Sequence, residues 1–287
     1  MDSPKYPDNL TDNEWTLVKH FIDVKSKLGE RPSLYGKRVM LDAVLYILRT
    51  GCSWRHLPKD FPSWMAVYSQ YRTWVKKGTF LLIHEALAKK IRKISNKESS
   101  VRAAIVDSQS VKVSDRGGLH GYNGGKKING RKRHILTDMN GNILELRVTE
   151  ANFGDRKGLK SLLSSMRKKF PNLKKIYADM GYQGFEFTKE IKDKFQVFLE
   201  IIKRPRKYFY VPHGVTDVNS YLESIGYKVE TGFQVQAKRW IVERTFSWLG
   251  KFRRLSKDYE YKILTSESFI YLAMIRHLLR RLSKSGV

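Results

Sequence analysis

Two short apolar runs, each ended by an aspartate, constrain the fold of this chain more than any other feature. Residues 103–106 are Ala-Ala-Ile-Val and lead into Asp107, and residues 176–178 are Ile-Tyr-Ala and lead into Asp179. Short apolar runs of this kind are typical of strands buried in a sheet. A carboxylate at the end of such a strand is unfavourable unless a positive group pairs with it. We therefore expect both aspartates at one sheet edge, beside a cation.

A third carboxylate, Glu243, lies in a stretch with helical spacing, residues 239–246. Two aspartates on adjacent strands and a glutamate from a helix crossing that edge would suit Mg²⁺ or Mn²⁺, which favour oxygen ligands. Two such ions about 3.5–4 Å apart can activate a nucleophile and stabilise a leaving oxygen at a phosphodiester. The alternative is that Asp107 and Asp179 are strand-end acids at turns, and that Glu243 pairs within its helix with Arg239.

The charge of the chain points to a polyanionic partner. There are 55 Lys and Arg against 28 Asp and Glu, a formal net charge of +27. A compact protein with this charge repels itself, and nucleic acid is the polyanion that basic surfaces commonly bind. The alternatives are a ribosome-like structural protein and a protein that adheres to acidic membranes. We expect no membrane span, since no run reaches about 18 apolar residues, and no signal peptide.

The single cysteine, Cys52, excludes an intrachain disulfide and a cysteine zinc site. It agrees with a reducing cytoplasm.

The first part of the chain, residues 1–95, is predicted to be all helical. Thr11 and Glu14 form a capping-box pattern, and further helices are expected at about 37–49, 64–77 and 80–94. Short helices joined by tight turns, one of them basic and aromatic, indicate a helix-turn-helix-like DNA-binding unit with Arg72, Lys76 and Lys77 as contacts. A plain helical bundle with the aromatic residues in its core fits the pattern equally well.

A polar linker at 95–102 precedes a change of pattern, so a second domain is expected over 101–287. Strands are predicted at 103–113, 134–138, 143–148, 176–179 and 197–202, with a hairpin turn at 140–142. Helices are predicted at about 156–169, 185–194, 237–252 and 266–282. Residues 203–236 are basic, contain Pro and Gly, and are interpreted as an insertion. The fold class is thus α/β with a mixed sheet.

A flexible glycine-rich loop is predicted at 117–127, running into a dense group of cations. We expect this region to hold a DNA backbone against the metal site, although a solvated charge run is the simpler interpretation. The candidate phosphate contacts are the lysine before the loop and the basic residues in and after it. They are Lys112, Lys126, Lys127, Arg131, Lys132, Arg133 and His134.

Several motifs in order make the chain resemble the insertion-sequence transposases of the IS5 group within the IS4/IS5 assembly. They include Asp-Ser-Gln-Ser-Val-Lys at 107–112, Gly-Arg-Lys-Arg-His at 130–134, Ala-Asp-Met-Gly-Tyr at 178–182 and Arg-Trp-Ile-Val-Glu-Arg-Thr-Phe at 239–246. The N-terminal segment Gly-Cys-Ser-Trp-Arg-His-Leu-Pro at 51–58 is similar to the helical domain of the same transposases. The resemblance extends over nearly the whole chain.

The resemblance implies an RNase H-like catalytic domain with a triad of acids, known as DDE. Carried over by motif, Asp107 and Asp179 are the two aspartates, Glu243 is the glutamate, and Arg239 supports it. The broader assembly has a tyrosine three residues before that arginine and a lysine seven after the glutamate. This chain has Gln236 and Gly250 there, so Lys251 or Arg254 is the candidate to replace that lysine.

The function implied is transposition of DNA by an enzyme that uses Mg²⁺ or Mn²⁺, with two ions expected. It would bind double-stranded DNA at the inverted repeats that end an insertion sequence, cut there, and join the freed 3′-OH to target DNA. A homo-oligomer on DNA and a cytoplasmic, nucleoid-associated location follow from the same resemblance. The alternatives are an RNase H-like nuclease without strand transfer and an inactive DNA-binding regulator.

Overall fold

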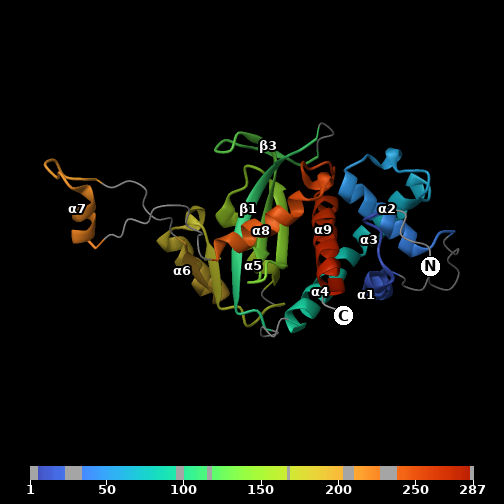
Figure 1. Ribbon diagram of the computed structural model, residues 1–287, viewed down its shortest axis with the longest axis horizontal. Helices are drawn as coiled ribbons and strands as arrows, with labels where there is room; N and C mark the ends of the chain where they lie inside the picture. Colours follow the sequence, from blue (N-terminus) through green and yellow to red (C-terminus); the bar gives the residue numbers. More distant parts are fainter. Residues whose placement is uncertain are drawn as a thin grey trace.

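A mixed β-sheet forms the middle of the molecule, and its central strand carries Asp107 (Figure 1). The computed structural model describes residues 6–22, 34–94, 100–114, 118–166, 169–202, 210–226 and 238–284. The strands are β1 (Ala103–Lys112), β2 (Gly121–Asn123), β3 (Ile128–Thr137), β4 (Ile143–Glu150), β5 (Lys175–Ala178) and β6 (Phe198–Ile201).

The strand order and directions confirm the expected RNase H-like architecture. The main order is β4-β3-β1-β5-β6, with β3 antiparallel to both β1 and β4. β1, β5 and β6 are parallel to one another. The predicted turn at 140–142 joins β3 to β4, where the Asp138 N–H donates to the Asn142 carbonyl at 2.9 Å and Gly141 has a φ of +84°. This positive φ is one that glycine adopts without strain.

The prediction for the glycine-rich segment was partly wrong. Residues 121–123 form strand β2, which pairs with the start of β3, so β3 begins at Ile128 rather than near His134. At Gly130 a Cβ atom would lie 1.9 Å from the Val111 carbonyl oxygen, so only glycine allows β1 and β3 to pair this closely. The glycines and cations hid a strand because no apolar alternation marks it.

Helices cover the two faces of the sheet. On one face, α5 (Asp155–Met166) and α6 (Phe185–Phe195) pack on Ala104, Val106 and Leu136. On the other face, α8 (Arg239–Gly250) packs on Ile105 and Tyr177. The long helix α9 (Ile263–Lys284) packs beside it, over Ile135, Leu146 and Val148. Side chains of successive strand residues point to opposite faces, so each face has its own core.

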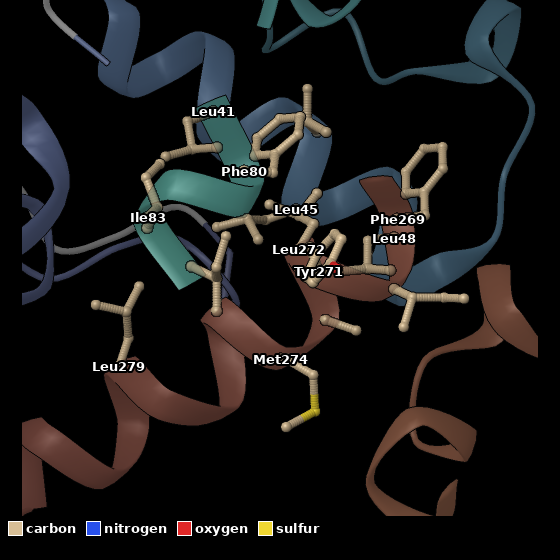
Figure 2. Close-up of a cluster of buried hydrophobic side chains, with 14 of the residues drawn as sticks. Leu41, Leu45, Leu48, Phe80, Ile83, Phe269, Tyr271, Leu272, Met274 and Leu279 are labelled. Carbon is tan, nitrogen blue, oxygen red and sulfur yellow. The ribbon is translucent and has the colours of Figure 1, made fainter. Parts of the chain in front are cut away.

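The N-terminal helices share one hydrophobic core with α9 (Figure 2). They are α1 (Asp12–Ile22), α2 (Lys37–Thr50), α3 (Trp64–Lys76) and α4 (Thr79–Ile94), with a short 3-10 turn η1 (Trp54–His56). Leu45, Phe80 and Ile83 lie around Leu272 of α9. The predicted boundary between 1–95 and 101–287 stays a prediction, but hydrophobic packing continues across it.

The N-terminal capping box is confirmed, and its glutamate also forms an ion pair with α9. Thr11 N–H donates to Glu14 at 3.0 Å, and Glu14 N–H donates to the Thr11 hydroxyl at 3.2 Å. The same Glu14 carboxylate accepts from Arg276 of α9 at 2.5 Å, where both side chains are nearly inaccessible. A buried ion pair is costly to leave half-made, so it fixes the position of α1 on α9.

Within the predicted insertion 203–236, the structure describes residues 210–226. They contain the short helix α7 (Val218–Ser224), whose first turn is capped by Asp217 (Figure 1). The remaining residues of that segment lie outside the described part of the chain. Among the described helices, none combines the length and the apolar character needed to cross a bilayer.

A buried histidine makes stability depend on pH. His84 of α4 is 1% exposed, and burial, followed by the charges of Arg92 and Lys169, lowers its pKa from 6.5 to about 3. Between these values the unfolded chain binds a proton that the folded chain does not, so folding is destabilised as the pH falls below 6.5. Relative to His84→Leu, the wild type should lose about 2 kcal/mol of unfolding free energy between pH 6.5 and 5, measured by urea denaturation.

The matched control is Phe80→Leu, at a buried position one turn earlier in the same helix. It should lower stability by an amount that does not change with pH. Parallel pH profiles for the wild type and His84→Leu would contradict the assignment.

Candidate active site

Asp107 and Asp179 are brought together by two neighbouring parallel strands. Ile105 of β1 is paired with Tyr177 of β5; Asp107 lies two residues further along β1, and Asp179 lies two residues after Tyr177, directly beyond the end of β5. Because alternate residues of a strand share a face, Asp107 lies on the face that α8 covers, and Asp179 is near enough for its charge to act on Asp107. The expectation that the sheet would bring the two aspartates to one place therefore agrees with the register.

Helix α8 is held over this place by apolar packing. Ile241 and Val242 contact Ile105 and Tyr177 in a small separate core. This positions Arg239, at the start of α8, close enough to Asp107 to influence its charge. Glu243 follows one turn later, with its side chain 51% exposed, and its carboxylate is 3.0 Å from the guanidinium of Arg239.

The third acid is therefore paired with Arg239, as the alternative interpretation of its spacing predicted. Within the described ranges, no three His, Cys, Asp or Glu side chains lie close enough together to hold a metal ion. A third carboxylate beside Asp107 and Asp179 would be repelled by both, whereas the i,i+4 pair of Arg239 and Glu243 is attractive.

The electrostatics of Asp107 show that the site favours positive charge. Its pKa is raised from 3.8 to about 6, chiefly because burial disfavours the charged form. The charge of Asp179 acts in the same direction, while the Ser108 N–H, which donates to Asp107 at 2.7 Å, acts against it. Asp179 in turn caps the turn after β5 by accepting the Gly181 N–H at 2.9 Å. A buried carboxylate beside a second one supplies oxygen donors of the kind that a hard divalent cation binds.

A fourth carboxylate, Asp155, reaches the same sheet edge and was not singled out in the sequence. The Ser108 hydroxyl donates to Asp155 at 2.7 Å, and the Lys132 ammonium is 3.1 Å from it. A Cβ on Gly181 would lie 3.1 Å from an Asp179 oxygen and 4.0 Å from an Asp155 oxygen, so the two acids flank this glycine. Sequence pattern identifies Asp155 only as the first residue of α5.

Tyr182 adds a buried hydroxyl to this group. It is 1% exposed, its oxygen has no hydrogen-bond partner among the described residues, and Asp155, Asp107 and Asp179 all help to raise its pKa. Burial is the main cause of that shift. The Tyr182 hydroxyl is thus buried within reach of the charges of these acids, and the sequence showed it only as part of the motif at 178–182.

The cation group of β3 is buried, which corrects the prediction that it contacts DNA phosphates. Arg131, Lys132, Arg133 and His134 are each 6% exposed or less. Arg131 donates to the carbonyls of Leu119, Glu260 and Tyr261, and Lys132 donates to that of Phe153. Side chains whose donors are already bound inside the protein cannot serve a phosphate. β3 is covered on both faces, so even its polar residues point inward.

The other cations predicted to contact DNA are also either buried or exposed. Arg254 is also buried, bound to Glu260 and to the Cys52 carbonyl, so it is not available to replace the family lysine. Gln236, the other departure from the family pattern, lies outside the described residues. The side chains that the structure leaves exposed are Lys112, Lys126, Lys127, Arg72, Lys76, Lys77 and Lys251. Of these, Lys126 is near enough to Asp107 to lower its pKa.

Comparison with known families supports the chemistry expected of this arrangement. Residues 99–278 match the family described as the transposase DDE domain. The chain belongs to the DDE transposases. Residues 10–84 match a second family, described as a putative transposase of the IS4/5 family, so the resemblance seen in the sequence is confirmed. Enzymes of this family move DNA segments and depend on divalent metal ions.

The chain is also similar to individual proteins. The chain is 30% identical over 113 residues to an uncharacterised 16.2 kDa protein of insertion element IS402 from Burkholderia cepacia, covering 38% of this chain and 76% of that protein. It is 26% identical over 192 residues to the transposase of IS1106 from Neisseria meningitidis serogroup B, covering 58% and 65%. Among solved structures, the Mos1 mariner paired end complex with Mn aligns over 94% of this chain and 84% of that one, at 12% identity and a TM-score of 0.22.

Because the cations of β3 are buried, we expect them to stabilise the folded protein. Removing Arg131 by Arg131→Met would leave Asp258, 3.1 Å away and 3% exposed, as an unpaired buried charge. The expected loss in unfolding free energy is about 3–5 kcal/mol, measured by urea denaturation.

The control is Lys112→Met at the exposed end of β1, which should change stability by less than about 0.5 kcal/mol. An Arg131→Met protein as stable as the wild type would show that the guanidinium is not a structural element.

Proposed function

We propose that this transposase cuts DNA at the terminal inverted repeats of its insertion sequence and joins the freed ends to target DNA, using Asp107, Asp179 and Glu243. The observation that carries the proposal is the position of Asp107 and Asp179 at one level of a parallel strand pair, with α8 packed over the same face. The desolvation of Asp107 and its repulsion from Asp179 are relieved when a cation lies between them.

The metal proposed for this place is Mg²⁺ or Mn²⁺, as two ions held by the three acids. When bound, these ions supply Lewis-acid activation of the phosphodiester and of the attacking oxygen. Glu243, which pairs with Arg239, would be the third ligand. Arg239 also lies near Asp107, and its charge acts to lower the pKa of that carboxyl, which favours the ionised form that a cation binds.

The reaction proposed has two transfers at one site. In the first, a water oxygen bonds to the phosphorus at the end of the element, and the bond to the 3′ oxygen breaks, leaving a 3′-OH. In the second, that 3′-OH bonds to a phosphorus of target DNA and displaces a 3′ oxygen there. Asp107 and Asp179, fixed by the Ser108 and Gly181 amides, hold the reacting groups in one orientation for both transfers.

The DNA contacts proposed are the cations that remain exposed. Lys126 and Lys127 on the β2–β3 turn, Lys112 at the end of β1, and Lys251 after α8 would hold phosphates near the acids. Arg72, Lys76 and Lys77 on α3 would recognise the inverted repeats through a helix-turn-helix-like unit in residues 1–95. Joining two ends calls for a homo-oligomer on DNA, and we place this activity in the cytoplasm, at the nucleoid.

The Asp179→Asn variant tests the site. Because the amide cannot supply the negative charge, Mg²⁺-dependent cleavage of DNA carrying the two ends of the element should fall by at least about a hundredfold. Cleavage and joining are measured on one labelled substrate, with Asp193→Asn, an exposed acid on α6, as the matched control. Equal activity in wild type and Asp179→Asn would refute the metal site, and hydrolysis without joining would favour the nuclease.

A separate variant tests Asp155 as a positioning residue. Ser108 donates its N–H to Asp107 and its hydroxyl to Asp155, so Asp155 orients the backbone that holds Asp107. Asp155→Asn should weaken Mn²⁺ binding about 10- to 100-fold, as seen when outer partners of metal ligands are removed. The measurement is the loss of the free Mn²⁺ resonance on titration, with circular dichroism to confirm folding.

For this variant too the control is Asp193→Asn, which should bind Mn²⁺ as the wild type does. Unchanged Mn²⁺ affinity in folded Asp155→Asn would remove Asp155 from the site.

A further inference from the structure

An open cavity of about 700 Å³ lies between the N-terminal helices and the segment that precedes α9. One wall comes from η1 and α3 and contributes Trp54, Trp64 and Tyr68. The opposite wall comes from residues 258–261 and contributes Tyr259 and Tyr261. Cavities of this size hold small organic groups such as a nucleobase with its sugar. Neither the acids nor the predicted DNA contacts account for it.

The rings of this cavity, which we term the aromatic pocket, differ in how firmly they are held. Trp54 is packed edge-on against Tyr68, with ring centroids 5.0 Å apart, and also lies 5.1 Å from the buried Tyr71. Tyr261 is 68% exposed and Tyr68 is 37% exposed, so both leave ring surface in contact with solvent. Large exposed aromatic surface in one hollow is characteristic of a binding site.

The charges around the aromatic pocket suit an anionic ligand with a flat ring. Arg55 is exposed, and its guanidinium lies 5.6 Å from the ring centroid of Trp64. Glu260 is the only acid in the lining, and it is neutralised by Arg254 at 2.6 Å. A ring platform beside an exposed arginine is the arrangement by which proteins stack a base and hold its phosphate.

The wall formed by residues 258–261 is fixed by the buried cations of the sheet. Arg131 donates to the carbonyls of Glu260 at 2.7 Å and Tyr261 at 2.8 Å, and it forms an ion pair with Asp258 at 3.1 Å. Tyr261 is therefore presented on a backbone that is anchored to the sheet, although its side chain is exposed. A pre-formed platform loses little conformational entropy when a ligand stacks on it.

The aromatic pocket also lies on the continuation of the strand that carries Asp107. Beyond β1, Val113 forms a bridge to Asp258, and the Ser114 N–H donates to the Asp258 carbonyl at 2.9 Å. An extended chain rises about 3.3 Å per residue, so the distance from Asp107 to Ser114 is about 23 Å. That is the length of about seven stacked nucleotides, and Lys112 lies exposed between the two places.

We propose that the aromatic pocket takes one unpaired base of the DNA whose backbone is bound at the acids, about seven nucleotides from the cut. Stacking on Tyr261 and Trp64 replaces stacking within the duplex, and Arg55 binds the neighbouring phosphate. DNA is the occupant that the observations favour, because the surface is cationic and the pocket follows the strand bearing Asp107. The inference rests on the proposed function for the position of the cut.

The test compares two probes with the full-length protein. One is a thymidine strand of about 16 nucleotides with a central 2-aminopurine, and the other is the same strand fully paired in a duplex. With Tyr261→Ala, the dissociation constant for the single strand should rise about tenfold and the quenching of 2-aminopurine on binding should be lost, while the duplex affinity changes by less than about twofold. Tyr261→Phe, which keeps the ring, should behave as the wild type.

The matched control is Tyr210→Ala, which removes a tyrosine that is 88% exposed and outside the aromatic pocket; it should leave both affinities unchanged. Single-strand affinity that is the same in Tyr261→Ala and Tyr210→Ala would overturn the proposal, as would equal losses on both probes. If the aromatic pocket binds protein instead of DNA, the single-strand affinity will be the same in Tyr261→Ala and Tyr210→Ala.

Cleavage assays on the same preparations separate this inference from the proposed function. If the wild type binds the single strand through Tyr261 but cuts no element ends with Mg²⁺, the proposed function fails and base binding stands. If the wild type cuts with Mg²⁺ and its affinity for the single strand does not depend on Tyr261, the pocket proposal alone fails.

Discussion

The repulsion between a buried carboxylate, Asp107, and its neighbour Asp179 is the constraint on which the rest of this structure depends. Asp107 lies on β1 and Asp179 directly follows the parallel strand β5, and burial together with the charge of Asp179 makes ionisation of Asp107 unfavourable. Helix α8 brings Arg239 to this place, and Ser108 and Gly181 donate their amides to the two acids. These partners lessen the repulsion but leave oxygen atoms that fit a divalent cation.

The same constraint explains why Glu243 is not beside the aspartates. A third negative charge would increase the repulsion, and Arg239 one turn earlier offers a better partner. Glu243 is therefore the ion-pair partner of Arg239 at the start of α8.

Buried cations connect this site with the rest of the molecule. Arg131 and Arg133 lie on the α9 side of β3, where they bind carbonyls of the segment 255–261. Lys132 lies on the opposite face and binds Asp155. One short basic motif therefore holds Asp155, beside the candidate site, and the wall of the aromatic pocket. The hydrophobic core that α9 shares with the N-terminal helices continues this packing to the first part of the chain.

Most elements could be predicted from the sequence because their local signals are strong. The apolar runs before Asp107 and Asp179, the capping box at Thr11 and Glu14, and the turn around Gly141 all have short-range physical causes. β2 and the start of β3 were missed, since glycines and cations mask the alternation that marks a strand. Asp155 was missed as a site residue for a different reason: its role comes from Ser108 and Gly181, distant in sequence.

The sequence by itself identified Asp107, Asp179 and Glu243 as the candidate acids, because their motifs occur in the order found in the DDE family. It also determined the mixed sheet and the helices that cover it, through hydrophobic periodicity. Only the tertiary structure decided which cations are exposed and which are buried. A basic residue has the same local signal in both cases, and the outcome depends on whether carbonyls and carboxylates from distant segments surround it. Such groups surround Arg131 and Arg254, whereas Lys112 and Lys126 are exposed.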